Sequence, residues 1–358
     1  MASGTIDTSK YVRWNSGVEK IPPGEAEDIQ AVADMINEMQ KAQYNNHRHM
    51  YGGTHARTQG VVKGKLIVGE LPPHLAQSLF SQPAEYPLAM RYSSEPGDPG
   101  LDDRIPQPRG LAMKIFNVHG EMFDIGKDYP TQDIEFNSAP AIELADAKTT
   151  KEIFELRLKY GGDKKELYKH YEARNDTDLQ KSRDQVPNKH LEVRTYRFGD
   201  YVIKYSLVSS GETQKSREDT VKPESHPDHI LSDWLKEFHG NYEAEYLFQV
   251  QFCENIEEQP IEYAGTPWDE EKFPWQTVGK VVIPKQDSFI PVRKAFWEDH
   301  MRLDPWHGLK SFQPLGSPNR LRRAVYPASS ALRRQVNGRK EVHLTSIDQI
   351  PDGCMIDV

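Results

Sequence analysis

The sequence has few of the features that mark secreted, membrane or nucleic-acid-binding proteins. Its 358 residues include two cysteines, Cys253 and Cys354, which are too few and too far apart for a disulfide framework. No apolar stretch approaches the roughly 20 residues that a membrane-spanning helix needs. There are 45 Lys and Arg against 54 Asp and Glu, a net charge of −9, so the basic excess typical of nucleic-acid binding is absent. We therefore expect no transmembrane segment and no nucleic-acid partner.

No targeting signal can be read at either end of the sequence. Residues 1–10 lack the apolar core of a signal peptide, and residues 356–358 are not a peroxisomal tripeptide. We expect a cytoplasmic protein with structural thiols.

Apolar spacing predicts a mixture of helices and strands. Helical periodicity covers residues 22–43, 148–160 and 228–238, the second ending at a Gly161-Gly162 stop. The Gly199-Asp200 pair between two strand-like runs predicts a hairpin over residues 192–208. Runs rich in β-branched and aromatic residues predict strands at 61–68, 86–93, 111–118, 201–208 and 245–252.

The chain shows no internal repeat and no composition shift that would divide it. Residues 161–190 and 209–227 are charged and nearly without apolar periodicity, which indicates solvated surface excursions. The stretch from Trp268 to Tyr326, rich in Trp and Pro, is expected to be irregular. We expect one unit over residues 1–358.

Four local patterns contain residues that could carry chemistry. Each also fits a purely structural role when it is taken alone, because a single histidine, serine or arginine near a strand is usually structural. The patterns are Thr54-His55-Ala56-Arg57 with Gly60, then Arg91-Tyr92-Ser93, then Arg109-Gly110-Leu111-Ala112-Met113-Lys114, and finally Arg322 four residues before Tyr326-Pro327, with Arg333 seven beyond the tyrosine.

The first and last patterns have a chemical meaning together. A guanidinium one helical turn from a tyrosine favours the phenolate, which can ligate ferric iron, and tyrosine is a known axial ligand of haem. A histidine on the opposite haem face can take a proton from one peroxide oxygen and return it to the other. His55 and Tyr326 would then face each other across a haem.

These patterns, in this order, resemble the haem catalase superfamily. The resemblance implies an α+β fold, an antiparallel β-barrel core with surrounding helices and haem b buried against the barrel. It also implies an N-terminal helical arm at about 1–50, the barrel at about 55–255, and an irregular wrapping segment with the proximal helix at about 256–340. The implied distal residues are His55 as acid and base, Ser93 as its orienting partner and Asn137 as a second peroxide contact. The implied cofactor contacts are Tyr326 as iron ligand, Arg322 to keep it ionised, and Arg91, Arg333 and Arg109.

Departures from the catalase pattern bear on the reaction. Thr54 stands where catalases usually have valine. Threonine at this place is similar to the catalase-related allene oxide synthases and the small catalase-like peroxidases. The resemblance therefore implies cleavage of organic, fatty-acid hydroperoxides, with a lipoxygenase as the supplier of substrate. A small catalase or general haem peroxidase is the alternative, and a haem-binding protein without turnover is a third. Catalases form dimers or tetramers, and for this chain a homodimer is expected.

Overall fold

A computed structural model describes residues 7–353, except 96, 106, 162–165, 167–168, 171–188 and 218–219. Cys354 and most of the expected excursion at 161–190 lie outside the described residues. The strands are β1 (Arg57–Val68), β2 (Ala84–Ser94), β3 (Arg109–Ile115), β4 (Gln132–Asn137), β5 (Lys189–Phe198), β6 (Tyr201–Ser209), β7 (Ala244–Phe252), β8 (Gln276–Ile283) and β9 (Pro314–Leu315).

These strands form one curled antiparallel sheet in the order β4-β3-β2-β1-β8-β7-β6-β5-β9. A further pairing of β4 with β5 brings the two ends of the eight long strands together and completes a barrel. This closure rests on one residue pair, Asn137 with Leu191. The interior is filled with large aromatic and aliphatic side chains, among them Phe80, Phe198, Tyr205, Phe248 and Phe252.

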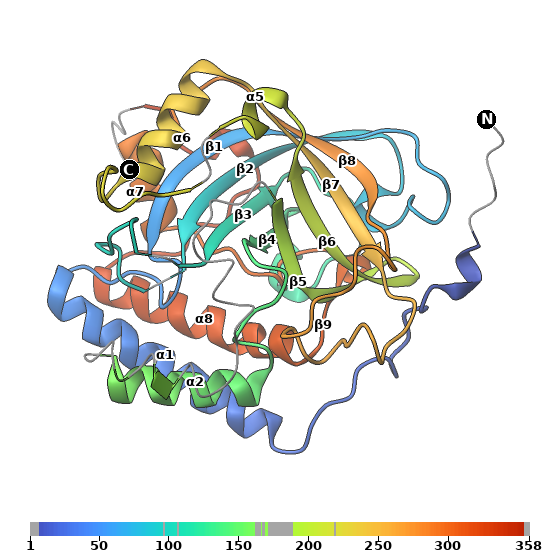
Figure 1. Ribbon diagram of the computed structural model, residues 1–358, viewed down its shortest axis with the longest axis horizontal. Helices are drawn as coiled ribbons and strands as arrows, with labels where there is room; N and C mark the ends of the chain where they lie inside the picture. The colour runs from blue at the N-terminus through green and yellow to red at the C-terminus, as the bar shows by residue number, and fades with distance from the viewer. Residues whose placement is uncertain are drawn as a thin grey trace.

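The helices lie outside the barrel. They are α1 (Glu25–His47), α2 (Ala147–Tyr160), α5 (Glu212–Lys215), α6 (Ile230–Asn241), α7 (Pro291–Asp299) and α8 (Ser317–Asn337). Short 3-10 turns occur at Thr8–Lys10, Ser78–Phe80, Asp124–Gly126, Lys310–Phe312 and Ile347–Gln349. Figure 1 shows α1, α2 and α8 stacked together beneath the barrel, with α8 nearest the strands. Among the described residues, every helix is too short or too polar to cross a membrane.

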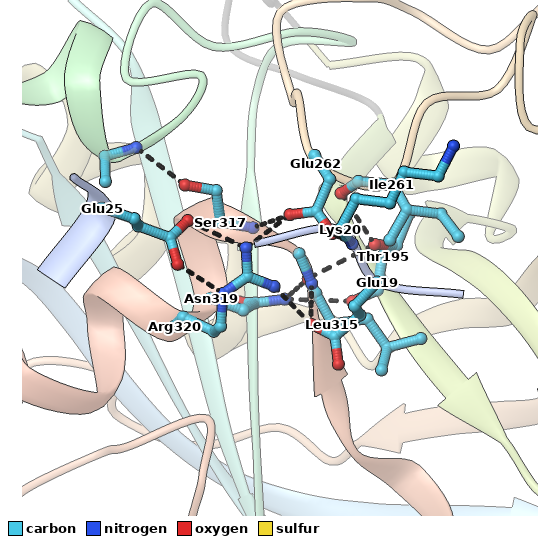
Figure 2. Close-up of polar contacts among 12 residues, drawn as sticks. Glu19, Lys20, Glu25, Thr195, Ile261, Glu262, Leu315, Ser317, Asn319 and Arg320 are labelled. Atoms are coloured by element: carbon cyan, nitrogen blue, oxygen red, sulfur yellow. Dashed lines mark hydrogen bonds and ion pairs between the residues drawn. The ribbon is translucent and has the colours of Figure 1, made fainter. Parts of the chain in front are cut away.

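An arginine cluster fixes the start of α8. Arg320 forms ion pairs with Glu19 at 2.6 Å, Glu25 at 2.7 Å and Glu262 at 2.6 Å (Figure 2). Burial alone would lower the pKa of Arg320, but its hydrogen bonds with Glu25 and Glu262 raise it, so the side chain stays charged. The cluster ties α8 to α1 and to two loops. The neighbouring Asn319 donates hydrogen bonds to backbone oxygens just before α8 and on β5, also drawn in Figure 2.

The structure confirms the expected helices and strands, with boundaries that differ by a few residues, as for α1 (Glu25–His47 against 22–43) and β3 (Arg109–Ile115 against 111–118). The hairpin turns at Gly199-Asp200, where Gly199 has φ 59° and Phe198 pairs with Tyr201. Helix α2 ends at Tyr160 as predicted, yet Gly161 has φ −59°, so it is not a left-handed cap. Of the second expected excursion, residues 212–215 form the short α5.

Strands β4 and β8 were not predicted, and the stretch after Trp268 is not wholly irregular. It contains β8 and α7, so the barrel extends past residue 255. Strand β8 is hard to predict from the sequence because it contains Gly279, and glycine usually weakens a strand. Here a Cβ on Gly279 would lie 3.0 Å from Leu66 Cδ1 and 3.1 Å from the Ile67 carbonyl oxygen, so the glycine permits close approach of β1. Strand β4 is short and carries polar residues, which hid its alternation.

Candidate functional site

A cavity of about 250 Å³ lies between the barrel and α8, lined by more apolar than polar surface. Strands β2, β3 and β4 and the loop before β1 form one wall, and α8 forms the other. The structure brings to this cavity every predicted site residue except Arg109: Thr54, His55, Arg91, Ser93, Asn137, Arg322, Tyr326 and Arg333.

His55 occupies the barrel side of the cavity in an unusual backbone conformation. Its φ is 51°, a region that side chains larger than glycine rarely adopt. Two hydrogen bonds hold it there. Its N–H donates to the Glu95 carbonyl at 2.6 Å, and its carbonyl accepts from Arg91 Nη2 at 2.5 Å. Backbone strain of this kind concentrates at functional sites, where the surrounding structure holds it in place.

The His55 ring is oriented by Ser93. Nδ1 lies 3.1 Å from Ser93 Oγ, and Ser93 Oγ donates to the Gly110 carbonyl at 3.3 Å. Because the hydroxyl has only one proton, it accepts from Nδ1–H. This tautomer leaves His55 Nε2 unprotonated and able to accept a proton.

Gly110 makes room for this ring. A Cβ at residue 110 would lie 2.4 Å from His55 Cε1, 2.5 Å from Nδ1 and 3.0 Å from Ser93 Oγ. The imidazole therefore packs directly on the backbone of β3. Burial, followed by the positive charge of Arg91, lowers the pKa of His55 from 6.5 to about 4, so the ring is neutral at pH 7.

Two further predicted residues flank His55. Asn137 is the last residue of β4. It pairs with Gly110 of β3, the residue on whose backbone the His55 ring packs. Thr54 lines the cavity next to His55. Among the described residues, the Thr54 hydroxyl forms no hydrogen bond with the imidazole.

Tyr326 and Arg322 are one helical turn apart on α8, as the sequence predicts. Arg322 Nη2 lies 3.3 Å from Tyr326 Oη. Helix α8 continues through Pro327, which lacks the N–H that would otherwise donate to the preceding turn. Arg322 is also held by Asn319 Oδ1 at 2.9 Å and the Tyr196 hydroxyl at 3.2 Å.

Glu135 is a site residue that the sequence analysis missed. The Tyr326 hydroxyl donates to Glu135 Oε2 at 2.6 Å, and Arg322 Nη2 bonds the same oxygen. Burial raises the pKa of Tyr326. Arg322 lowers it and Glu135 raises it, with a net rise. The expected effect of Arg322 is thus present but outweighed, and the phenol is neutral in this structure. The alternation Asp133-Ile134-Glu135-Phe136 is the signal that would have placed Glu135 on a strand.

Arg91 and Arg333 form a cationic end of the cavity. Within the described part of the chain neither forms an ion pair, and Arg333 Nε has no hydrogen-bond partner, although its Nη2 donates to the Met301 carbonyl at 2.6 Å. Burial and then the neighbouring charge of Arg91 lower the pKa of Arg333 to about 10. Two partly buried cations without carboxylate partners suit a dianionic ligand.

Arg109, which was predicted to contact the cofactor, is the predicted site residue that does not line the cavity. Its guanidinium donates to Ser94 Oγ at 3.2 Å and to the Asp103 carbonyl at 3.3 Å, and it does not line the cavity. The reason is strand alternation: Arg109 and Gly110 are consecutive on β3, so if Gly110 faces the cavity Arg109 faces away.

These residues fit a haem. The lining includes apolar side chains from α1, α8 and β4, the cations at one end match two propionates, and a tyrosine lies on the wall that carries no histidine. Among the described residues, no three His, Cys, Asp or Glu side chains gather into a group that could hold a metal ion.

Comparison with solved structures identifies the fold. No protein-family profile and no curated protein matches the chain. A fungal catalase aligns with TM-score 0.60 and 14% identity over 83% of this chain and 63% of its own. Catalase A from Saccharomyces cerevisiae (0.58, 15%, 83% and 65%) and a bacterial catalase (0.58, 15%, 89% and 65%) are also similar. The chain therefore has the catalase fold, as predicted, and spans less than two thirds of the length of these catalases.

Proposed function

We propose that the protein is a haem-dependent enzyme that cleaves the O–O bond of a hydroperoxide. One observation carries the proposal: the Ser93-oriented His55 and the Arg322-paired Tyr326 line a single cavity of a catalase-fold protein. Tyr326 would ligate the iron of haem b, and Arg91 and Arg333 would bind its propionates. Haem supplies the redox chemistry of O–O cleavage when bound.

His55 performs the proton transfer in this proposal. Its neutral Nε2 accepts the proton of the hydroperoxide, and the resulting imidazolium returns it to the departing oxygen. Ser93 keeps the ring in place during both steps by accepting from Nδ1–H. In this proposal Asn137, at the end of β4, contacts the second peroxide oxygen.

The proposed substrate is an organic hydroperoxide, that of a polyunsaturated fatty acid, with an allene oxide or an alcohol as product. Support comes from the apolar part of the cavity wall, which would suit an acyl chain. This part is formed by Leu144 and Phe154, whereas the apolar residues of α1, α8 and β4 would contact the haem. Thr54 adds no support through its hydroxyl, which does not bond the imidazole. A lipoxygenase partner, a homodimer, the single unit over 1–358 and a cytoplasmic location also stay proposals.

A catalase that disproportionates hydrogen peroxide is a second candidate, favoured by the three catalases with similar folds. It would use the same His55, Asn137 and Tyr326. Wild-type protein loaded with haem should be given hydrogen peroxide, a fatty-acid hydroperoxide and tert-butyl hydroperoxide in parallel, following oxygen release and organic products.

The outcomes separate the candidates. Conversion of the fatty-acid hydroperoxide with little oxygen from hydrogen peroxide supports the first candidate. Rapid oxygen release without organic products supports a catalase. Haem binding without turnover of any peroxide indicates a haem-binding protein, and failure to bind haem refutes the whole proposal.

A further inference from the structure

Arg157 ties together two segments of the cavity wall. It lies in the last turn of α2, outside the barrel (Figure 1), where Nη1 donates to Glu95 Oε1 at 3.2 Å and Nη2 donates to Glu143 Oε1. The three side chains are between 14% and 20% exposed. Among the described residues, both glutamates line the cavity and Arg157 does not, so the arginine supports the wall from outside the cavity.

The contact with Glu95 bears on His55. Glu95 directly follows β2, and its carbonyl accepts from the His55 N–H at 2.6 Å, one of the two hydrogen bonds that hold His55 at φ 51°. A backbone conformation in this region persists only when the surrounding contacts fix it. Because Arg157 holds the Glu95 side chain, it restricts movement of the residue that supplies the acceptor carbonyl.

The contact with Glu143 bears on Asn137. Asn137 ends β4, and residues 138–146 connect it to α2. The start of this connection is fixed by Ser138, whose Oγ accepts from the Arg109 N–H at 2.9 Å. Further along, Arg157 fixes it through Glu143. One side chain of α2 therefore supports both the hydrogen-bond acceptor of His55 and the loop that begins after Asn137.

The shape and surroundings of Arg157 suit this role. A guanidinium is a planar fork whose two terminal nitrogens can bond two carboxylates at once, whereas a lysine ammonium is a single point charge. The Arg157 guanidinium also lies 5.7 Å from the centre of the Phe154 ring, and Phe154 lines the cavity. Partly buried charge pairs are screened by water and salt less than exposed pairs are. These contacts are therefore stiffer than an ion pair on the open surface.

We propose that Arg157 is a positioning residue, which holds His55 and Asn137 in the geometry for proton transfer by pairing with Glu95 and Glu143. This inference rests on the proposed function, in which His55 and Asn137 act on the hydroperoxide. Groups that move a proton must be held in place by the residues around them, and small displacements slow the reaction. Arg157 itself touches neither the hydroperoxide nor the haem in this proposal.

The test uses the haem-loaded full chain and cyanide as a probe. Hydrogen cyanide binds haem iron as the anion, so a neighbouring base must accept its proton, and under the proposed function that base is His55. The variant is Arg157→Gln. Lys151→Gln is the matched control, because Lys151 is also on α2 and pairs with Asp28 at 2.8 Å, but neither of these two residues lines the cavity.

The readouts are the haem titration, the cyanide affinity and kcat. We expect Arg157→Gln to bind haem as wild type does and to lose about tenfold in cyanide affinity and in kcat, less than a full displacement of about 1 Å would cost. Lys151→Gln should match wild type in all three measurements.

The outcomes separate this inference from the proposed function. Equal cyanide affinity in wild type, Arg157→Gln and Lys151→Gln overturns the inference and leaves the proposed function intact. Loss of haem in folded Arg157→Gln also overturns it, because the arginine would then support the whole cavity. A wild-type chain that binds no haem refutes the proposed function itself.

A second variant covers the case in which Arg157→Gln does not fold. Glu95→Ala removes one contact of Arg157 but keeps the carbonyl that accepts from His55. Weaker cyanide binding with a normal haem titration in Glu95→Ala supports the inference, and wild-type cyanide binding overturns it.

Discussion

The two walls of the cavity hold their key side chains by different means. On the barrel wall, His55 is oriented by a neutral hydroxyl at 3.1 Å and by close packing on Gly110, with no carboxylate bonded to its ring. On the helical wall, Tyr326 lies in a charged triad with Arg322 and Glu135. A group that must gain and lose a proton is better served by a neutral partner, since a bound carboxylate would hold the imidazolium. Under the proposed function Tyr326 must stay in one place, and charged partners hold a side chain more firmly than a neutral hydroxyl does.

The largest predicted effect concerns the helical wall. Under the proposed function, Tyr326→Phe removes the oxygen that would ligate the iron, so we expect haem affinity to fall by more than about 100-fold, beyond the cost of losing an outer-shell partner. Haem titration followed at the Soret band measures it. Tyr196→Phe is the control, because it removes another hydroxyl bonded to Arg322. Normal haem binding by Tyr326→Phe would contradict the assignment.

On the barrel wall, the corresponding change should spare haem and abolish chemistry. His55→Ala removes the acid and base but no proposed cofactor contact, so we expect a normal Soret titration and a loss of about 10²- to 10⁴-fold in turnover, the range for general acid–base catalysis. His74→Ala serves as the control, since it removes another buried imidazole remote from the cavity. Loss of haem together with activity would mean that the two walls are not separable in this way.

How far the sequence predicts the site depends on the kind of contact. Arg322 next to Tyr326 follows from helical spacing, which is a short-range property. Ser93 next to His55, 38 residues away, was implied only by the resemblance. Glu135 was not predicted because its role depends on contact between β4 and α8. Glu135 and Tyr326 are 191 residues apart in the chain, and no local sequence pattern indicates that they are in contact. Five strands were predicted from their β-branched and aromatic residues, whereas the barrel they form was implied by the resemblance to the haem catalases. Strand β8 was not predicted, because the glycine that lets β1 approach looks like a break.

A single methyl group should disturb the barrel wall alone. Gly110→Ala would place a Cβ 2.4 Å from His55 Cε1, so the ring must move. A displacement of about 1 Å can cost on the order of 100-fold in rate, and we expect a turnover loss approaching this with haem binding retained. Gly69→Ala, where a Cβ would meet nothing within 4 Å, should match wild type. Full activity in Gly110→Ala would show that ring placement on this wall is not critical.

The smallest effect, and the finest distinction between the walls, concerns pH. Burial and then Arg91 lower the pKa of His55 to about 4; Arg194 and Arg322 act in the same direction and Glu135 opposes them. A lowered pKa keeps the ring neutral as the pH falls below 6.5, so about nine-tenths of the molecules retain the base at pH 5, against only a few per cent at the ordinary value. We therefore expect kcat/KM at pH 5 to equal that at pH 7 within about twofold, and to fall only as the pH passes through about 4.

Circular dichroism at each pH separates this fall in activity from acid unfolding. The control is needed because protonation of Glu25 removes its ion pair with Arg320, which anchors α8. A limb near pH 6.5 in folded protein would mean that burial and Arg91 do not lower the pKa of His55, and would contradict this prediction.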